Sequence, residues 1–255
     1  MIRSVLKEVQ QREKIESLSR YKTKLLSIIS HQIKNPLAII QGYASLIRDK
    51  TVNEPKAINE VSQKIHNNAR ELINLLNNLL DWSHLEEGKL TYNFEKIELN
   101  GFLKGIIEDS RFGAEQKNLK LNFEPFGAAQ GRSLPQEIQI EADKVKLGQI
   151  FRNLIDNAIK YTEKGFVKIQ YQLKENKVLV SVSDSGQGIP KESLPNLFQK
   201  FVRVEGEEKR SVGSGLGLYI SKEIVEAHHG RIWAESEGEG RGSKFVVELP
   251  IEPVK

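Results

Sequence analysis

The feature that most constrains the fold of this chain is a broad apolar stripe on one long helical segment, residues 56–87. A single helical hairpin cannot cover a stripe of this width, whereas two copies can, as a four-helix bundle. The pattern therefore predicts a homodimer. The alternative is a hairpin that packs only on the next domain of its own chain. The stripe consists of two heptad rows, Ile58, Ile65, Leu72, Leu79 and Val61, Asn68, Leu75, Trp82, widened by Ile73, Leu76 and Leu80.

A second helix is expected before it, over residues 4–48, with 49–55 as the connecting turn. In the frame of its apolar seam, His31 points outward and Asn35 follows one turn later on the same side. Pro36 has no N–H for the carbonyl of Gln32, so it should bend the helix beside the imidazole. The plainer alternative is a solvated histidine and a proline that starts a new helix. The seam is Leu26, Ser30, Ile33, Leu37, Ile40, Ala44 and Ile47.

Composition narrows the functional classes. The chain has 255 residues, enough for two domains, and it has no cysteine, which excludes disulfides, iron–sulfur clusters and thiolate zinc sites. A net charge of +4 without dense basic clusters speaks against nucleic-acid binding. No apolar run approaches the ~18 residues of a membrane span, so no membrane segment is expected.

After Gly88 the periodicity changes to that of an α+β sandwich, a mixed and mostly antiparallel sheet with helices on one face. Asp143 is positioned to cap the helix that follows it. Strands are expected at 120–126, 138–141, 166–174, 177–184, 231–236 and 243–250, with helices at 99–117, 143–162, 194–201 and 216–228.

The helix over 143–162 carries a polar stripe opposite its apolar side. Two amide oxygens beside an ammonium suit a phosphate chain with Mg²⁺, because this ion prefers oxygen ligands. Polar faces rich in asparagine are also common on ordinary helices, so the stripe alone is weak evidence. Its members are Asn153, Asn157, Lys160 and Tyr161.

Two glycine-rich segments follow. In DSGQGIP (184–190), Asp184 ends a strand and can accept a hydrogen bond from an exocyclic amine such as that of adenine, although a simple turn would also explain the segment. In GSGLGL (213–218), glycines lead directly into a helix start, where backbone N–H groups bind phosphate. The segment GEGRG (238–242) is interpreted as a turn. His66, His84, His228 and His229 have no metal-ligand spacing and receive no catalytic role.

The order of these motifs resembles that of the sensor histidine kinases of two-component systems, over nearly the whole chain. Five motifs in the family's order make a strong signal, although each is weak to moderate alone. SHQIKNPL (30–37) resembles the phosphoacceptor box and QIFRNLIDNAIKYT (149–162) the N box. The first glycine box, the F box and the second glycine box resemble DSGQGIP, LFQKFVRV (197–204) and GSGLGL.

The resemblance implies a dimeric helical hairpin bearing the phosphorylated histidine, followed by an ATP-binding sandwich of the Bergerat type. The implied domains are a signal-transmitting helix or coiled coil at 1–22, a dimerisation and phosphotransfer domain at 23–88, a linker at 89–98 and a catalytic ATP-binding domain at 99–255. Expected partners are a second copy and a response regulator acting in trans. The resemblance also implies an upstream sensor domain, which we expect to be missing from this chain. The expected location is the cytoplasm, either as a free protein or as the cytoplasmic part of a membrane sensor.

The resemblance also implies residue roles, with ATP and Mg²⁺ as cofactors. Asp184 would contact the adenine amine, and Asn157 would bring its oxygen to Mg²⁺ with Asn153 beside it. Lys160 and Tyr161 would contact phosphates or ribose, and Arg203 would reach the γ-phosphate. The nucleotide pocket and its lid, residues 205–212, would be shaped by Gly186, Gly188, Gly213, Gly215, Leu216 and Gly217.

The phosphoacceptor box departs from the family at one position. Gln32 stands where the family commonly has an acid beside His31, and an amide cannot act as a base. Because a neutral imidazole can attack unaided, we expect a working but slower kinase. Two alternatives stay open: a dimeric pseudokinase that only responds to ATP, and an ATPase of the chaperone or topoisomerase type.

Asn35 occupies the place where family members hold Thr or Asn to aim water at the phosphoaspartate of the regulator. We therefore hypothesise phosphatase activity as well. An Asn35→Ala protein that dephosphorylated its regulator at the full rate would contradict that hypothesis.

Overall fold

The computed structural model describes residues 29–125, 138–202 and 215–251. Contacts divide the described chain into two compact units, residues 29–80 and the residues from Asp81 onward. Predictions that fall on residues 1–28, 126–137, 203–214 and 252–255, including Leu26, Arg203, Gly213 and the proposed lid, lie outside the described residues. Among the described helices, none combines the length and apolar character needed to cross a bilayer.

The first unit belongs to a helical hairpin, whose second helix continues past Leu80 into the second unit. One helix covers residues 29–48 without interruption, so Pro36 does not begin a new helix. The second, α2 (Pro55–Glu86), begins at a proline, which suits a first helical residue because its missing N–H would have no partner there. Gly88 follows the helix with a φ of 65°, and the N–H of Lys89 donates to the carbonyl of His84 at 2.8 Å. This glycine ends the helix as predicted.

Burial in the hairpin is uneven. Val61 and Leu75 are buried, whereas Ile73, Leu76 and Leu80 are 57%, 43% and 58% exposed. The wide stripe that the sequence showed is thus only partly covered within one chain. Large apolar side chains in an exposed row are typical of an association surface.

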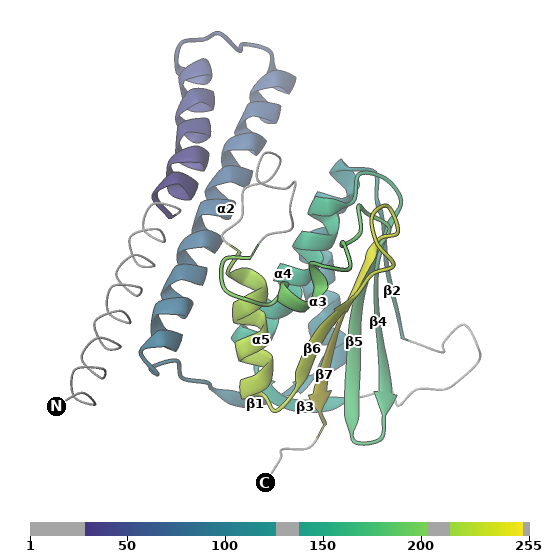
Figure 1. Ribbon diagram of the computed structural model, residues 1–255. Helices are drawn as coiled ribbons and strands as arrows, with labels where there is room; N and C mark the ends of the chain where they lie inside the picture. Colours follow the sequence, from purple (N-terminus) through teal and green to yellow (C-terminus); the bar gives the residue numbers. More distant parts are fainter. Residues whose placement is uncertain (1–28, 126–137, 203–214, 252–255) are drawn as a thin grey trace, which may run out of the picture. The chain divides into compact units, whose positions relative to one another are not determined.

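The second unit is built on a five-stranded sheet in the order β2-β4-β5-β7-β6 (Figure 1). β2 and β4 are parallel and the other pairs are antiparallel, so the sheet is mixed as predicted. Along β5, alternate residues from Val178 to Asp184 are buried, as expected for a strand with one covered face. The strands are β2 (Lys120–Pro125), β4 (Phe166–Lys174), β5 (Lys177–Asp184), β6 (Arg231–Glu235) and β7 (Ser243–Pro250).

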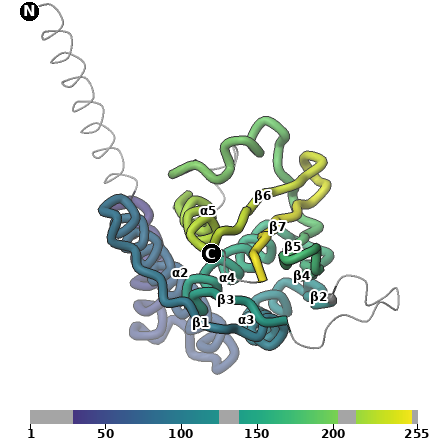
Figure 2. The backbone as a smooth tube through the Cα atoms, turned by 90° about the horizontal axis from the view of Figure 1, so that it is seen from below, coloured from purple at the N-terminus to yellow at the C-terminus, as the bar shows by residue number. Residues whose placement is uncertain are grey.

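Three helices cover one face of this sheet: α3 (Leu99–Gln116), α4 (Lys144–Tyr161) and α5 (Gly217–Ala227). Figure 2 shows them side by side along the strands. Asp143 caps α4 as predicted, accepting the N–H of Lys146 at 2.9 Å. The predicted apolar side of α4 forms the core: Leu147, Ile150, Phe151, Leu154, Ile155, Ala158 and Ile159 are all buried.

One predicted element differs. The segment 194–201 was expected to be a short helix, but only Leu194–Asn196 forms a helical turn, of the 3₁₀ type (η2), followed by turns. The segment is held by hydrogen bonds that span three residues rather than four, as from the N–H of Leu197 to the carbonyl of Leu194 and from that of Gln199 to Asn196, and Phe201, with a φ of 61°, then ends it. Its N–H instead donates to the carbonyl of Gly215 at 3.0 Å.

A small second sheet joins the segment after α2 to the sandwich. β1 (Phe94–Glu98) pairs antiparallel with β3 (Gln139–Asp143). His228, at the end of α5, is buried beneath this junction; its Nε2 accepts the N–H of Asp143 at 2.9 Å and its Nδ1 donates to the carbonyl of Ile224 at 2.7 Å. This histidine therefore does more than end a helix, because it ties α5 to the start of α4.

These bonds require a neutral imidazole, and burial lowers the pKa of His228 below its ordinary 6.5, while the bond to Ile224 and the nearby Asp143 oppose the shift. In the unfolded chain His228 takes up a proton at higher pH than in the fold. The stability that it contributes is therefore complete above pH 6.5 and is lost as the pH falls below it.

We predict that the free energy of unfolding falls as the pH drops below 6.5, by at most about 1.4 kcal/mol per pH unit for this single proton. His228→Gln, which does not titrate, should flatten that slope. His229→Gln removes the exposed neighbouring imidazole and is the matched control. Urea titrations between pH 5.5 and 8 measure the slopes, and equal slopes for the two variants would contradict the assignment.

Candidate functional site

The predicted nucleotide residues meet at the end of β5. Asp184, the last residue of the strand, is only 8% exposed. Its Oδ1 accepts the N–H of Gly186 at 2.8 Å, and its Oδ2 accepts a short hydrogen bond from the hydroxyl of Ser243 at the start of β7. The carboxylate is thus held in one orientation from both sides.

Gly186 lies where no side chain fits. A Cβ at this position would lie 2.4 Å from the carbonyl oxygen of Tyr161 and 2.9 Å from the hydroxyl of Thr162. The next residue, Gln187, donates its N–H to that same carbonyl of Tyr161 at 3.2 Å. The glycine loop, residues 185–188, therefore packs directly on the C-terminal end of α4, which joins two of the predicted motifs.

The turn at 238–242 closes the other side of the glycine loop. A Cβ at Gly188, whose φ is 73°, would lie 2.0 Å from the carbonyl oxygen of Gly238. Gly242 donates its N–H to the carbonyl of Gly186 at 3.1 Å. The segment is a turn as predicted, and it also supports the loop, a role that the sequence did not reveal.

The polar stripe of α4 leads from this loop to the start of α5. Asn153 donates from Nδ2 to the hydroxyl of Ser221 at 3.1 Å, and a Cβ at Gly217 would lie 2.6 Å from its Oδ1. Tyr161, at the other end, touches the glycine loop. Tyr161 lies eight positions after Asn153 on the helix, about 12 Å at roughly 1.5 Å per residue. Asn157 lies between them and is half-buried.

Asn157 differs from Asn153 in its contacts. Within the described part of the chain its side chain makes no hydrogen bond with another residue, whereas Asn153 is engaged by α5. An amide oxygen in this position is available to a ligand. Lys160, one turn later, holds its ammonium 5.5 Å from the ring centroid of Tyr161.

The first turn of α5 begins at the second predicted glycine motif. Leu216, the N-cap residue, is fully buried, and its side chain gives no cap hydrogen bond to the first N–H groups of the helix. Gly215 has a φ of 67°, and a Cβ there would lie 2.8 Å from the backbone of Phe201. An uncapped helix start of this kind favours an anion.

The hairpin unit presents the other predicted group. His31 is exposed, and its Nδ1 lies 3.3 Å from Nδ2 of Asn35, so the two side chains share one outward side as predicted. Gln32, the residue after His31, is only 8% exposed. A neutral amide tolerates this burial better than a carboxylate would.

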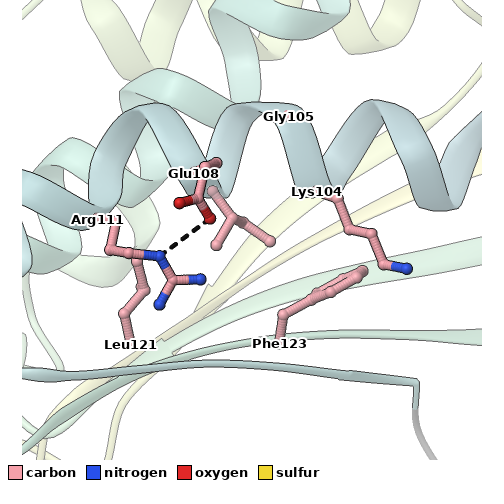
Figure 3. Close-up of a pocket in the computed structure, with 7 residues that line it drawn as sticks. Lys104, Gly105, Glu108, Arg111, Leu121 and Phe123 are labelled. Carbon is pink, nitrogen blue, oxygen red and sulfur yellow. Dashed lines mark hydrogen bonds and ion pairs between the residues drawn. The ribbon is translucent and has the colours of Figure 1, made fainter.

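A cavity of about 570 Å³ lies elsewhere in the second unit, between α3 and β2 (Figure 3). None of the predicted site residues lines it. Its polar wall includes an ion pair, with Arg111 Nε 2.9 Å from a carboxylate oxygen of Glu108.

Together these features define a nucleotide-binding α/β sandwich linked to a hairpin with an exposed histidine. Residues 142–253 match the family model described as histidine kinase-, DNA gyrase B- and HSP90-like ATPase, which implies ATP binding. Residues 21–88 match the His Kinase A (phospho-acceptor) domain. The second match separates this chain from the gyrase and chaperone branches: it belongs to the sensor histidine kinase family and contains its catalytic core.

Similar proteins agree with this assignment. The sensor protein kinase WalK of Staphylococcus aureus is 30% identical over 99% of this chain, which spans 58% of the length of WalK. The catalytic domain of histidine kinase ThkA is 30% identical, with a TM-score of 0.54, over 63% of this chain and 99% of that domain. A structure of ThkA in complex with the response regulator protein TrrA is 26% identical, with a TM-score of 0.61, over 95% of this chain and 64% of that one.

The close approach at Gly186 yields a stability prediction. Gly186→Ala places a methyl group against a backbone carbonyl that cannot move aside, and we expect a loss of about 1–3 kcal/mol, the usual cost of overpacking. Gly105→Ala on α3, where no atom lies within 4 Å of the new Cβ, is the control and should gain about 0.4–1 kcal/mol. Thermal unfolding measures both changes, and equal melting temperatures would show that the loop does not press on α4.

Proposed function

We propose that this chain autophosphorylates His31 from Mg-ATP and passes the phosphoryl group to an aspartate of a response regulator. The observation that carries the proposal is the outward imidazole of His31 in a chain that also holds the Asp184 site. An accessible acceptor and an ATP site are the two parts that such a transfer needs, because positioning and charge neutralisation dominate phosphoryl transfer.

In the nucleotide site, Asp184 would accept a hydrogen bond from the adenine amine, since both its oxygens are already oriented. The uncapped start of α5 at Gly217 would hold phosphate oxygens. The distance of about 12 Å along α4 suits a nucleotide that lies between these two ends. Lys160 and Tyr161 would contact phosphates or ribose, and Arg203, outside the described residues, would reach the γ-phosphate.

Asn157 would hold the magnesium ion. Its half-buried amide has no partner among the described residues, so its oxygen is available as a ligand. Within the described ranges, no group of three or more His, Cys, Asp or Glu side chains could hold a metal. This donor set fits Mg²⁺, which binds through one or two protein oxygens together with substrate phosphates and waters. The ion would neutralise charge on the phosphates.

In the transfer, the bond between the γ-phosphorus and the bridging oxygen of ATP breaks as a bond to a ring nitrogen of His31 forms, with ADP as the leaving group. Asn35 faces Nδ1, so Nε2 is the nitrogen outside that contact. Attack through Nε2 uses the tautomer with the proton on Nδ1; because the amide Nδ2 of Asn35 can donate only to an unprotonated Nδ1, this tautomer requires that the contact be released, and the Nδ1 proton passes to water once the new bond has formed. Gln32 is buried and has no basic form, so it takes no proton, and the attack of His31 would proceed without a base at that position, as expected for a slower kinase.

The partner proposals rest on separate observations. ThkA was solved with a response regulator, which supports a regulator as the acceptor here. Phosphatase activity through Asn35 stays a prediction. The use of ATP and of such a regulator implies a cytoplasmic location. A second copy of the chain is supported by the exposed apolar row at Ile73, Leu76 and Leu80.

Incubation with γ-labelled ATP and Mg²⁺ should label the protein, and the label should be lost in acid because a phosphoramidate is acid-labile. His31→Ala should abolish the labelling. His66→Ala, which removes another exposed histidine of the same unit, should leave it unchanged. Nucleotide binding without label would favour a pseudokinase, and steady ATP turnover without self-labelling would favour a simple ATPase.

For the dimer, Ile73→Glu combined with Leu80→Glu should produce a monomer, because two buried charges in the association surface are costly. The matched control is Asn67→Glu combined with Asn74→Glu, two exposed positions that are also seven residues apart on α2 but turned away from the apolar row. Light scattering after gel filtration gives the mass. A dimer that survives in both pairs would contradict the proposed surface.

A further inference from the structure

The C-terminal end of α4 cannot cap itself. The last four carbonyls of a helix lack partners within it, and many helices supply them through a left-handed residue after the last turn. Here the residue after α4, Thr162, is extended, with φ −103° and ψ 120°. Its hydroxyl donates to the carbonyl of Ala158 at 2.7 Å, and the N–H of Gln187 donates to that of Tyr161. The other two of the last four carbonyls are those of Ile159 and Lys160.

Lys117 serves both of them. Its Nζ lies 2.8 Å from the carbonyl oxygen of Ile159, 2.8 Å from that of Lys160 and 3.4 Å from that of Thr162. A cation at a helix C-terminus also lies at the negative end of the helix dipole. One side chain of another helix thus completes the end of α4.

The backbone of Lys117 is itself fixed. It directly follows α3, where Asn118 has a φ of 55° and the N–H of Leu119 donates to the carbonyl of Ala114 at 2.9 Å. Leu119 is buried. Helix α3 thus ends with a residue in the left-handed conformation, the type of C-terminal cap that α4 lacks. Lys117 therefore projects from a rigid position, and burial, partly opposed by Glu163, lowers the pKa of its ammonium.

The capped end of α4 is also the surface on which the glycine loop rests. The carbonyl of Tyr161 accepts the N–H of Gln187, and the closest approach of Gly186 is to the same oxygen. A shift of this end would move the loop that follows Asp184. We propose that Lys117 is a positioning residue for the nucleotide site: it holds the end of α4 against the glycine loop without touching the nucleotide. This inference rests on the proposed function.

The test compares variants of the full chain. Lys117→Met keeps the length of the side chain but removes its donors, and Lys117→Arg keeps a cation with several donors. Lys120→Met is the matched control, since Lys120 is exposed three residues away and makes no side-chain hydrogen bond within the described chain. Circular dichroism at the assay temperature confirms that each variant is folded.

Titration calorimetry with Mg-ADP should show about a tenfold weaker affinity for Lys117→Met, as expected when charge-assisted hydrogen bonds are lost. Lys117→Arg should recover most of it and Lys120→Met should match the wild type. In autophosphorylation, Lys117→Met should raise KM for ATP and leave kcat nearly unchanged, because Lys117 contacts no reacting atom. Wild-type affinity in Lys117→Met, or a fall in kcat at constant KM, would overturn the proposal.

Hydrogen exchange separates this inference from the proposed function. In the nucleotide-free protein, the amide of Gln187 should exchange faster in Lys117→Met than in Lys120→Met, since its acceptor Tyr161 is no longer held. Equal exchange in the two variants would overturn the positioning role. This comparison needs no kinetic measurement, so it holds even where Lys117→Met is too weakly active for kinetics, and Lys117→Arg should exchange like Lys120→Met. A wild-type protein that binds no nucleotide would contradict the proposed function and leave the exchange comparison intact.

Discussion

The contact between the carbonyl end of α4 and the glycine loop after β5 is the one on which the nucleotide site depends. Tyr161 contributes a backbone oxygen to it, and Gly186 approaches so closely that any side chain would collide. The loop in turn follows Asp184, whose carboxylate is oriented by Gly186 and Ser243. Because packed backbone cannot yield as a side chain can, this contact sets where an adenine-binding carboxylate lies relative to the stripe of α4.

Helix α4 has three roles, and each uses a different part of the helix. Its apolar side builds the core of the sandwich, its N-terminus is capped by Asp143, and its polar stripe joins the glycine loop to α5. The helical period keeps these sides apart. A rigid helix with a fully packed side is a suitable support for a site, because positioning governs phosphoryl transfer.

Local signals predicted much of this. The bounds of β4 and β5 followed from alternation and from a polar turn between them, and the residues of the α4 core followed from helical spacing. His31 and Asn35 lie on one exposed side, as their spacing predicted. The helix expected at 194–201 is shorter than predicted: only Leu194–Asn196 is helical, and Phe201, with a φ of 61°, donates its N–H to the carbonyl of Gly215 outside the segment.

What the sequence by itself determined is the order of elements, the faces that are buried, and which side chains reach the same stripe, since these depend on the period of helices and strands. Only the tertiary structure decided that Ser243 orients Asp184, that His228 bonds the backbone of Asp143, and that Lys117 caps α4. These contacts join residues 59, 85 and 42 positions apart. A lysine or serine with no local pattern shows its partner only when the sheet and helices bring both together.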